Sequence, residues 1–177
     1  PYDENHIIGF GKDTVEVKGN AFYLGMKMAV FNVSDVTNPK ELFTEKIGDR
    51  GTDSELLRNH KALLFSKENN LLAFPVTLME IKNGQEKYRD GYPQYGQFSF
   101  QGAFVYNIDL SKGFSLKGRI THLSKDDYSK AGDHWYNSEK NVERILYIGD
   151  KLYTLSQGKI KVNQMSDLKD IKEIEIH

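Results

Sequence analysis

The stretch Val30-Phe31-Asn32-Val33-Ser34-Asp35 decides the fold, because similar stretches recur twice further along the chain. The later copies are Val105-Tyr106-Asn107-Ile108-Asp109 and Val162-Asn163-Gln164-Met165-Ser166-Asp167. The sequence around each copy follows a period of two, which is typical of β-strands. Each copy ends in an Asp, whose side chain can accept a hydrogen bond from the following turn. The recurrence predicts one structural unit repeated three times.

Working outward from these copies, the pattern predicts four short strands in each of three units, at residues 6–47, 60–121 and 144–176. The predicted strands are 6–10, 15–23, 26–35 and 41–47, then 60–65, 71–81, 103–109 and 114–121, then 144–149, 152–156, 160–167 and 171–176. Only 54–59 and 138–142 are expected to form helical turns, and both are too short for a self-supporting helix. The chain is therefore predicted to be mostly or wholly β.

Units of four antiparallel strands with no helix between them are typical of β-propeller blades. A β-sandwich is the alternative, although it would not need the repeat. The units begin 54 and then 84 residues apart, and the longer spacing reflects polar insertions at 83–97 and 124–141. Propellers usually close with about four to eight blades. We therefore expect residues 1–177 to form a partial propeller domain, either an incomplete ring or half of a dimeric six-bladed ring.

The composition excludes several classes of protein. The 177 residues include 24 Lys and Arg against 25 Asp and Glu, so the net charge of −1 gives no electrostatic case for nucleic-acid binding. We expect no membrane-spanning segment, because no run of about 18 apolar residues occurs. Zero Cys excludes disulfides, thiolate metal sites and Cys nucleophiles within the chain. The opening residues Pro1 to Asn5 are not a signal peptide, so we expect any leader to lie upstream.

The chain resembles the secreted bacterial and archaeal proteins that carry a C-terminal β-propeller domain, which are distant relatives of WD-repeat proteins. The resemblance is carried by Ile8-Gly9-Phe10-Gly11-Lys12-Asp13-Thr14, by Met28 to Asp35 with Asn38-Pro39, by His60-Lys61-Ala62-Leu63-Leu64-Phe65, and by Arg144 to Asp150 with Leu152-Tyr153-Thr154. It implies a propeller fold and an extracellular or cell-surface location. It implies no particular reaction, cofactor or catalytic residue.

Two similar polar stretches, Asp53-Ser54-Glu55 and Asn137-Ser138-Glu139, precede the second and third units. Each Ser lies six residues before the first residue of its unit, His60 or Arg144. Oxygen-rich side chains repeated around a ring could bind a ligand or hold Ca²⁺ or another divalent ion. They could instead cap short helical turns, with Ser accepting backbone N–H groups. We favour capping, and we favour a structural role for His60 at the start of a strand.

Both insertions contain candidate binding residues. Tyr88, Tyr92 and Tyr95 could present rings to a protein or glycan, or belong to a hairpin that packs on itself. Asp133 and His134, near Asp126 and Asp127, are a candidate metal pair, although no known ligand spacing is matched and a solvated loop is the simpler interpretation. The adjacent Trp135 and Tyr136 could stack on a sugar or fill a gap between blades.

These features favour a non-catalytic extracellular binding or interaction scaffold over an enzyme. The sequence has no G-x-S-x-G, P-loop, H-E-x-x-H or G-x-G-x-x-G motif. The alternative is a metal-dependent hydrolase that uses the same loop face. We expect no obligatory cofactor. A protein or glycan ligand is expected at the loop face, and either missing upstream blades or a second copy of the chain should complete the ring.

Overall fold

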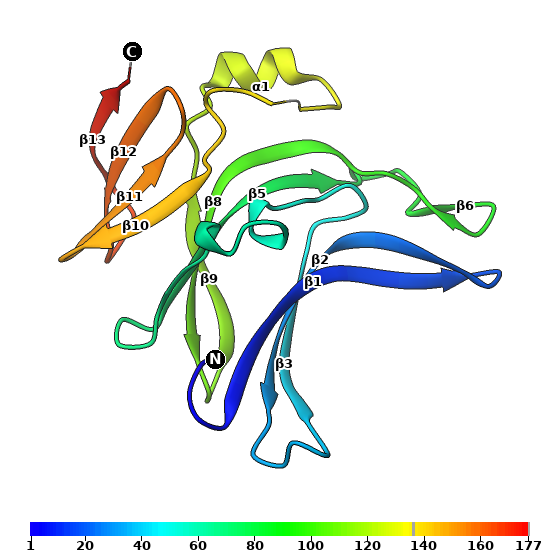
Figure 1. Cartoon of the computed structure of the whole chain (residues 1–177). Helices are drawn as coiled ribbons and strands as arrows, with labels where there is room; N and C mark the ends of the chain where they lie inside the picture. The colour runs from blue at the N-terminus through cyan, green and yellow to red at the C-terminus, as the bar shows by residue number, and fades with distance from the viewer. Residues whose placement is uncertain (136, 177) are drawn as a thin grey trace.

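The computed structural model describes residues 1–135 and 137–176, and nearly all of its regular structure is β. Three antiparallel sheets follow one another along the chain and are arranged like a fan (Figure 1). The predicted all-β fold class is confirmed. Within the described residues, no helix is both long and apolar enough to cross a membrane.

The elements fall into three main sheets and a few connecting pieces. The first sheet has the order β1 (His6–Val17), β2 (Asn20–Asn32), β3 (Lys40–Ile47). The second has the order β4 (Leu64–Ser66), β5 (Leu71–Glu80), β8 (Gln97–Asp109), β9 (Gly113–Ile120). The third has the order β10 (Arg144–Ile148), β11 (Lys151–Leu155), β12 (Lys159–Gln164), β13 (Asp170–Glu175). The remaining elements are the paired strands β6 (Tyr88–Arg89) and β7 (Tyr92–Pro93), the 3₁₀ helices η1 (Glu55–Leu57) and η2 (His60–Ala62), and the helix α1 (Lys125–Ala131).

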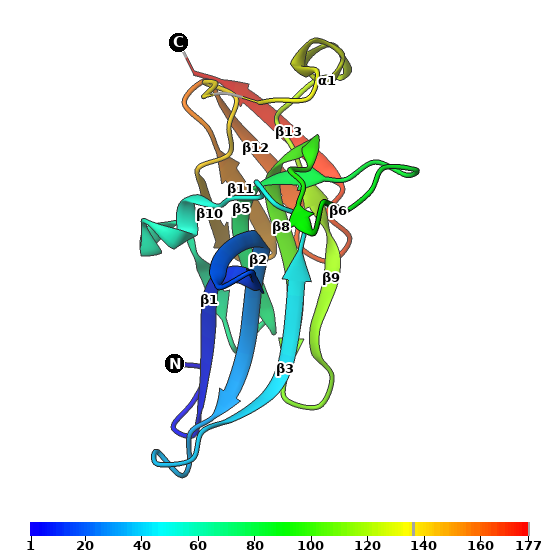
Figure 2. The ribbon, with the colours of Figure 1, turned by 90° about the vertical axis from the view of Figure 1, so that its right-hand side faces the viewer.

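The second sheet is buried on both faces, and this determines where the other two sheets lie (Figure 2). The even-numbered residues of β5 from Leu72 to Leu78 pack in a core shared with the first sheet. Leu71 and Ala73 of the same strand pack in a separate core shared with the third sheet. Successive side chains of a strand point to opposite faces, so one apolar strand contributes to both cores. Each fully buried large side chain contributes about 1.5–3 kcal/mol of burial free energy.

The first sheet has three strands where the sequence pattern predicted four. β1 continues through the predicted break after Phe10, with a bulge between Lys12 and Thr14. Its turn into β2 is the pair Lys18-Gly19, with φ of 52° and 78°. A two-residue type I′ turn, which is common in β-hairpins, requires positive φ at both of its central residues. The turn was missed because Lys is not one of the residues that mark it. The predicted strand 15–23 runs across the turn and is divided between β1 and β2, and the predicted strand 26–35 begins inside β2.

The start of the second unit also differs from the prediction. His60 does not open a strand: it lies in η2 and is exposed, and the first strand of this sheet begins at Leu64. The helical turn expected at 54–59 is present as η1. No helix forms at 138–142. The four strands expected in the third unit are present as β10 to β13.

The helix α1 lies in the 124–141 insertion, where the sequence pattern predicted only a polar loop. Ser124 accepts a hydrogen bond from the backbone N–H of Asp127, and the Asp127 side chain accepts one from the backbone N–H of Ser124. This reciprocal pair is a capping box, which satisfies N–H groups that a helix start otherwise leaves free. Lys130 pairs with Asp126 one turn away at 2.7 Å. The Ser-x-x-Asp spacing was the signal for this helix.

A buried histidine joins the second sheet to the third. His122 follows β9, and its Nδ1 lies 2.9 Å from Ser156 Oγ while its Nε2 lies 2.8 Å from Thr154 Oγ1. Only 5% of His122 is exposed. Burial, helped by the positive charges of Lys159 and Lys161, lowers the pKa of His122 to about 4. The imidazole is therefore neutral at pH 7 and bridges two hydroxyl groups.

Acidification should weaken this joint. Because the pKa of His122 in the folded chain is below its unfolded value, its stabilising contribution is complete above about pH 6.5 and is lost as the pH falls towards 4. Urea unfolding at pH 7 and pH 4.5 should show a smaller acid-induced loss in the His122→Gln variant than in the wild type, by on the order of 2 kcal/mol. The exposed His60→Gln variant is the control and should follow the wild type. Equal acid-induced losses in all three proteins would contradict the assignment.

Candidate functional site

Four of the predicted site residues line one hollow at the junction of the second and third sheets. Asp53 and Ser54 come from the chain between β3 and η1, Glu55 is the first residue of η1, and Asn137 comes from the chain between α1 and β10. The hollow has a volume of about 150 Å³ and is called the rim pocket here. Its other lining residues are Arg58, Pro75, Val76, Thr77, Gln101, Asn141, Val142 and Glu143.

Backbone pairing with β5 positions the first wall of the rim pocket. The N–H of Asp53 donates to the carbonyl of Thr77 at 3.0 Å, and the N–H of Thr77 donates back at 2.8 Å. Two residues earlier on β5, the carbonyl of Pro75 accepts a hydrogen bond from the Ser54 hydroxyl. Strand β4 pairs with β5 only as far as Ala73, so β5 has an unpaired edge at Pro75. Proline is suited to such an edge because it has no backbone N–H that would be left without a partner. The Ser54 hydroxyl also accepts from the N–H of Leu56 at 3.1 Å, which caps η1.

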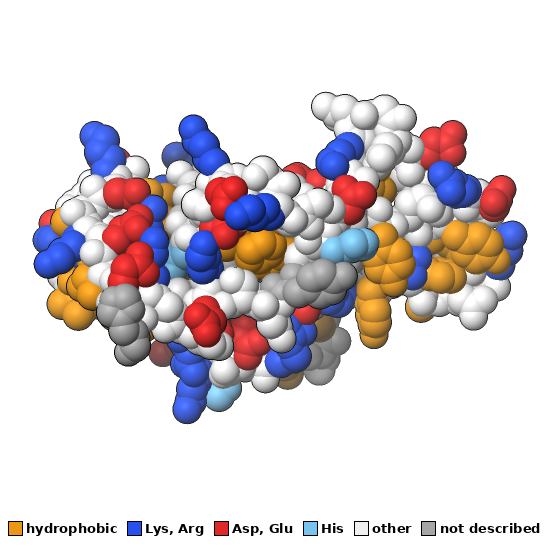
Figure 3. Space-filling view, turned by 90° about the horizontal axis from the view of Figure 1, so that it is seen from above, with side chains coloured by type: hydrophobic (Ala, Val, Ile, Leu, Met, Phe, Trp, Pro, Cys, Tyr) orange, Lys and Arg blue, Asp and Glu red, His pale blue; other side chains and the backbone are white. Residues whose placement is uncertain are grey.

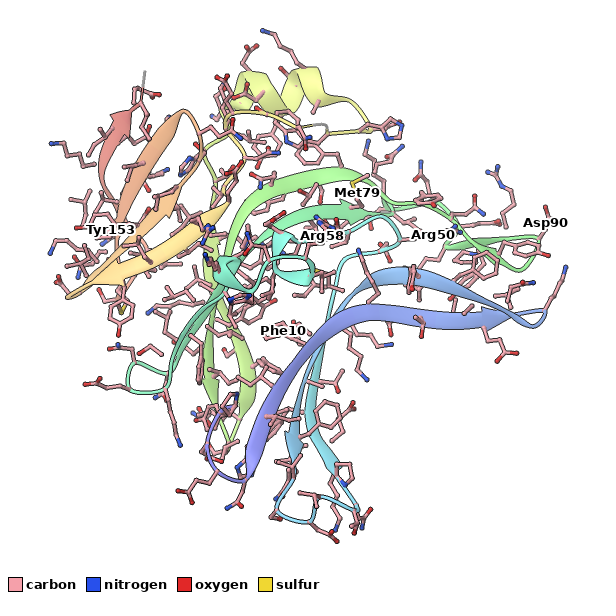
Figure 4. All side chains as sticks on the ribbon, in the orientation of Figure 1. Phe10, Arg50, Arg58, Met79, Asp90 and Tyr153 are labelled. Carbon is pink, nitrogen blue, oxygen red and sulfur yellow. The ribbon has the colours of Figure 1, made fainter. Side chains whose placement is uncertain are left out.

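The charges of this wall are partly neutralised within the chain. Asp53 lies 2.8 Å from Lys12 Nζ and 2.6 Å from a guanidinium nitrogen of Arg58 (labelled in Figure 4). Burial acts to raise the pKa of Asp53, but the hydrogen bonds and positive charges of Lys12 and Arg58 outweigh it and lower the pKa. Glu55 is only loosely paired, at 3.8 Å from Arg58. Asp53 is therefore ionised and held in place, and Glu55 is the freer carboxylate.

A buried amide holds the opposite wall. Gln101 of β8 is 3% exposed and donates its Nε2 hydrogen to the carbonyl of Val142 at 3.2 Å, while its Oε1 accepts from the N–H of Val142 at 3.0 Å. The side chain thus pairs with the backbone as a neighbouring strand would. The adjacent Glu143 carboxylate accepts a hydrogen bond from Gln157 Nε2 at 2.9 Å and lines the pocket.

Ser138 and Glu139 lie beside the rim pocket in a neighbouring hollow of about 300 Å³, and Asn137 lines both. The Ser138 hydroxyl accepts from the N–H of Lys140 at 3.2 Å, so it supports a turn as Ser54 does. The capping interpretation is therefore supported at Ser54, and it is wrong at Ser138, which supports a turn where no helix forms. The two similar sequence stretches are brought together at the same rim.

Tyr92 does not reach the rim pocket. Its ring contacts Phe22 of the β1–β2 hairpin edge-on, with centroids 5.7 Å apart, and the Lys18 ammonium lies 4.8 Å from its centre. The guanidinium carbon of Arg50 lies over the ring of the neighbouring Tyr95, 4.1 Å from the ring centroid. The tyrosine insertion therefore forms a hairpin, in which β6 pairs with β7, and this hairpin also packs against the tip of the first sheet. Hydrophobic side chains gather over this projecting part at the right of Figure 3.

The candidate metal pair lies in separate surroundings. Asp133 contacts Lys82 at 3.3 Å, and His134 lines a hollow of about 260 Å³ together with residues of α1 and with Trp135, Asn137 and Ser138. Among residues 1–135 and 137–176, no three His, Asp or Glu side chains come together closely enough to hold a metal ion. Metal binding stays a prediction from the sequence.

Trp135 fills a gap in the protein. Its ring stacks on Phe98 of β8 with centroids 5.1 Å apart, and its Nε1 donates to Asn141 Oδ1 at 2.6 Å. The gap-filling interpretation of this residue is thus supported over sugar stacking. Tyr136, proposed with it, lies outside the described residues.

Sequence reasoning missed the residues that shape the rim pocket from within the sheets. Gln101 and Thr77 are polar residues inside strongly apolar strands, and a polar residue in such a strand was the available signal. Arg58 and Glu143 are single charged residues beside the two similar polar stretches. Arg58 and Glu143 come together only because two sheets pack against each other, and a local sequence pattern does not predict that packing.

Comparison with known proteins gives one family and two distant relatives. The sequence model of the family described as "Beta propeller domain" matches residues 1–168. An uncharacterised protein of Methanocaldococcus jannaschii is 24% identical over 175 residues, which are 99% of this chain and 20% of that protein. An uncharacterised protein of Archaeoglobus fulgidus is 24% identical over 174 residues, which are 98% of this chain and 19% of that protein. The chain spans about a fifth of the length of these curated relatives.

The two serines should differ in their importance to the fold. Ser54→Ala removes both the η1 cap and the bond to the Pro75 carbonyl inside the protein, and should lower the free energy of unfolding by about 2 kcal/mol. Ser138→Ala removes one exposed hydrogen bond and should cost less than about 0.5 kcal/mol. Urea denaturation of the two variants measures the difference. Similar losses would mean that the contact with β5 contributes little.

Proposed function

Because the chain belongs to the beta propeller domain family, we propose that it is a non-catalytic binding scaffold whose ligand enters the rim pocket. The convergence of Asp53, Glu55 and Asn137 from separate connections on one hollow is the observation that carries the proposal. Loops held on a rigid sheet framework are where folds of this kind place binding residues. The proposal includes an extracellular or cell-surface location, which the resemblance to exported propeller proteins supports.

The size of the rim pocket favours a single inserted group over a whole small molecule. Its volume of about 150 Å³ is below the range of about 300–1,000 Å³ that is usual for small-molecule sites. A side chain from a protein partner fits such a hollow, with the rest of the partner lying on the surrounding rim. This favours a protein over a glycan as the ligand.

The charge of the rim pocket favours a basic side chain. Three carboxylates line it, those of Asp53, Glu55 and Glu143, against the one guanidinium of Arg58. Asp53 already forms ion pairs with Lys12 and Arg58. Glu55 and Glu143 are therefore the carboxylates that can accept further hydrogen bonds from a ligand. A carboxylate pair suits the guanidinium of an arginine, which donates several hydrogen bonds in a planar fork. An arginine-bearing protein segment is therefore the ligand class.

The same geometry argues for binding over catalysis at this pocket. The Ser54 hydroxyl donates its hydrogen to the Pro75 carbonyl and accepts from Leu56, so no base is placed to activate it as a nucleophile. The lowered pKa of Asp53 keeps that carboxyl ionised, which suits a fixed charge and does not suit a general acid at neutral pH.

The proposal is tested with N-acetyl-arginine methylamide as the probe and its neutral citrulline counterpart as the comparison. Titration followed by ¹⁵N NMR should move the amide signals of Thr77 and Val142 with the arginine probe and much less with citrulline. Glu55→Gln and Glu143→Gln should each weaken binding about tenfold, the effect of losing one charged partner.

The matched control is Glu68→Gln, which removes an exposed carboxylate in the turn between β4 and β5. It should bind the probe as the wild type does. Signals that move only at sites remote from the rim pocket, or equal weakening by all three substitutions, would reject the proposed ligand class.

A further inference from the structure

A second hollow lies where the first sheet meets the second, at the place where the β1–β2 hairpin and the tyrosine insertion (residues 83–97) project side by side (Figure 1). Its volume is about 340 Å³, and its charged lining residues are Asp13, Lys46, Asp49, Arg50 and Lys87. We call it the Arg50 pocket. Among the described residues, none lines both this pocket and the rim pocket. It lies between two sheets of this chain, so it does not depend on a further blade.

Backbone contacts fix the walls of the Arg50 pocket. The N–H of Gly96 donates to the carbonyl of Arg50 at 2.8 Å, which ties the chain after β3 to the tyrosine insertion. The bulge in β1 falls at Asp13. A β-bulge re-aims a side chain, and the Asp13 carboxylate lies 2.8 Å from the ammonium of Lys46 on β3. The charged groups are thus held in place from three separate segments.

Both carboxylates of the Arg50 pocket already have partners within the chain. Asp13 forms its ion pair with Lys46. Asp49 accepts a hydrogen bond from the Lys87 ammonium at 3.0 Å and another from the N–H of Ile81 at 2.8 Å. These pairs leave the charge of Arg50 to be accounted for.

Arg50 is the cation of this pocket that no carboxylate neutralises (labelled in Figure 4). Among residues 1–135 and 137–176, its guanidinium donates to the Pro93 carbonyl at 2.7 Å and to the Tyr95 hydroxyl at 3.3 Å, and it forms no ion pair. The guanidinium carbon lies 4.1 Å from the ring centroid of Tyr95 and 5.3 Å from that of Phe22. A guanidinium has more N–H donors than these two acceptors use. A carboxylate matches such donors in a planar fork, so the pocket suits a carboxylate ligand.

Exposed tyrosine rings lie beside this anion site. Arg50 also lines an adjoining hollow of about 260 Å³, together with Phe22, Tyr23 and Tyr95. Tyr23 is 68% exposed and Tyr95 is 67% exposed. Open aromatic faces next to hydrogen-bonding groups offer a surface on which the C–H face of a sugar ring can pack. An aspartate or glutamate side chain would satisfy Arg50 but has no flat apolar face to cover these rings.

We propose that the Arg50 pocket binds a hexuronate unit of an acidic glycan, with its carboxylate on Arg50 and its ring against Tyr23 and Tyr95. The volume of about 340 Å³ is within the range of about 300–1,000 Å³ that is usual for small-molecule sites. The rim pocket, at about 150 Å³, is below that range. The two sites are separate, and this proposal does not rest on the ligand proposed for the rim pocket.

Titration with methyl β-D-glucuronoside tests the proposal, with methyl β-D-glucoside as its neutral counterpart. In ¹⁵N NMR spectra, the amide signals of Gly51 and Gly96, which adjoin Arg50, should move with the acidic sugar and much less with the neutral one. Arg50→Gln should weaken binding of the glucuronoside about tenfold, because it removes the charged partner of the carboxylate. Tyr23→Ala changes an exposed side chain and should weaken binding about fivefold through loss of ring packing.

Arg89→Gln is the matched control, since it removes an exposed guanidinium from β6 of the same insertion and lies outside the pocket lining. It should bind the glucuronoside as the wild type does. Unchanged amide signals in the third sheet show that each variant is folded. Equal weakening by Arg50→Gln and Arg89→Gln, equal affinity for the two sugars, or signals that stay still at Gly51 and Gly96 would overturn the proposal.

A third probe, N-acetyl-glutamate methylamide, separates a sugar acid from an acidic peptide. The peptide probe should bind more weakly than the glucuronoside and should be insensitive to Tyr23→Ala, because it does not cover the ring. Binding of the peptide probe as tight as that of the glucuronoside, with neither affected by Tyr23→Ala, would show that the pocket takes an acidic peptide and that the hexuronate assignment is wrong.

Discussion

Burial of both faces of the second sheet is the constraint on which the rest of the structure depends. Residues 71–76 of β5 are buried without interruption, and the alternation of a strand sends Leu72 and Phe74 to one side and Leu71 and Ala73 to the other. Two separate cores follow, so one sheet must lie on each side. A sandwich of two sheets would satisfy only one of these faces. The fan of three sheets is the arrangement that leaves neither face in water.

The rim pocket follows from the same sheet. Its two walls are attached to the second sheet by hydrogen bonds that use the sheet's own geometry: Asp53 pairs with Thr77 as an added strand residue, and Gln101 pairs with the backbone of Val142. The pocket is the space left where the connections from two neighbouring sheets meet. Its shape is therefore fixed by backbone pairing, and its selectivity is left to a few charged side chains such as Glu55 and Glu143.

The sequence was most informative where alternation is strong and turns are marked. The strands of the third unit were predicted closely because Gly149-Asp150 and Gln157-Gly158 separate clear runs of alternating residues. The first sheet was predicted with one strand too many, because alternation continues through the long β1–β2 hairpin and its Lys-Gly turn carries no strong signal. The helix α1 was missed because its residues are polar and its capping box is only a local feature.

The candidate site could be predicted in part for a related reason. The repeated position of Ser54 and Ser138 before successive units identified two connections that meet at one rim, as sequence symmetry can. Tyr92, the candidate from the tyrosine insertion, does not line the rim pocket, because the direction in which an insertion folds depends on its contacts, here with Phe22 of another sheet. Arg58 and Glu143 were not identified, because only the packing of the sheets brings them together.

Amide hydrogen exchange read strand by strand tests the central role of the second sheet most directly. If that sheet is the core that the other two depend on, the amides of β5 and β8 should exchange only through global unfolding, with the free energy measured by urea denaturation. The outermost strand β13, whose residues are all exposed, should exchange through local opening at much lower free energy. Protection of β13 equal to that of β5, or early exchange at Phe74 and Val105, would contradict the account.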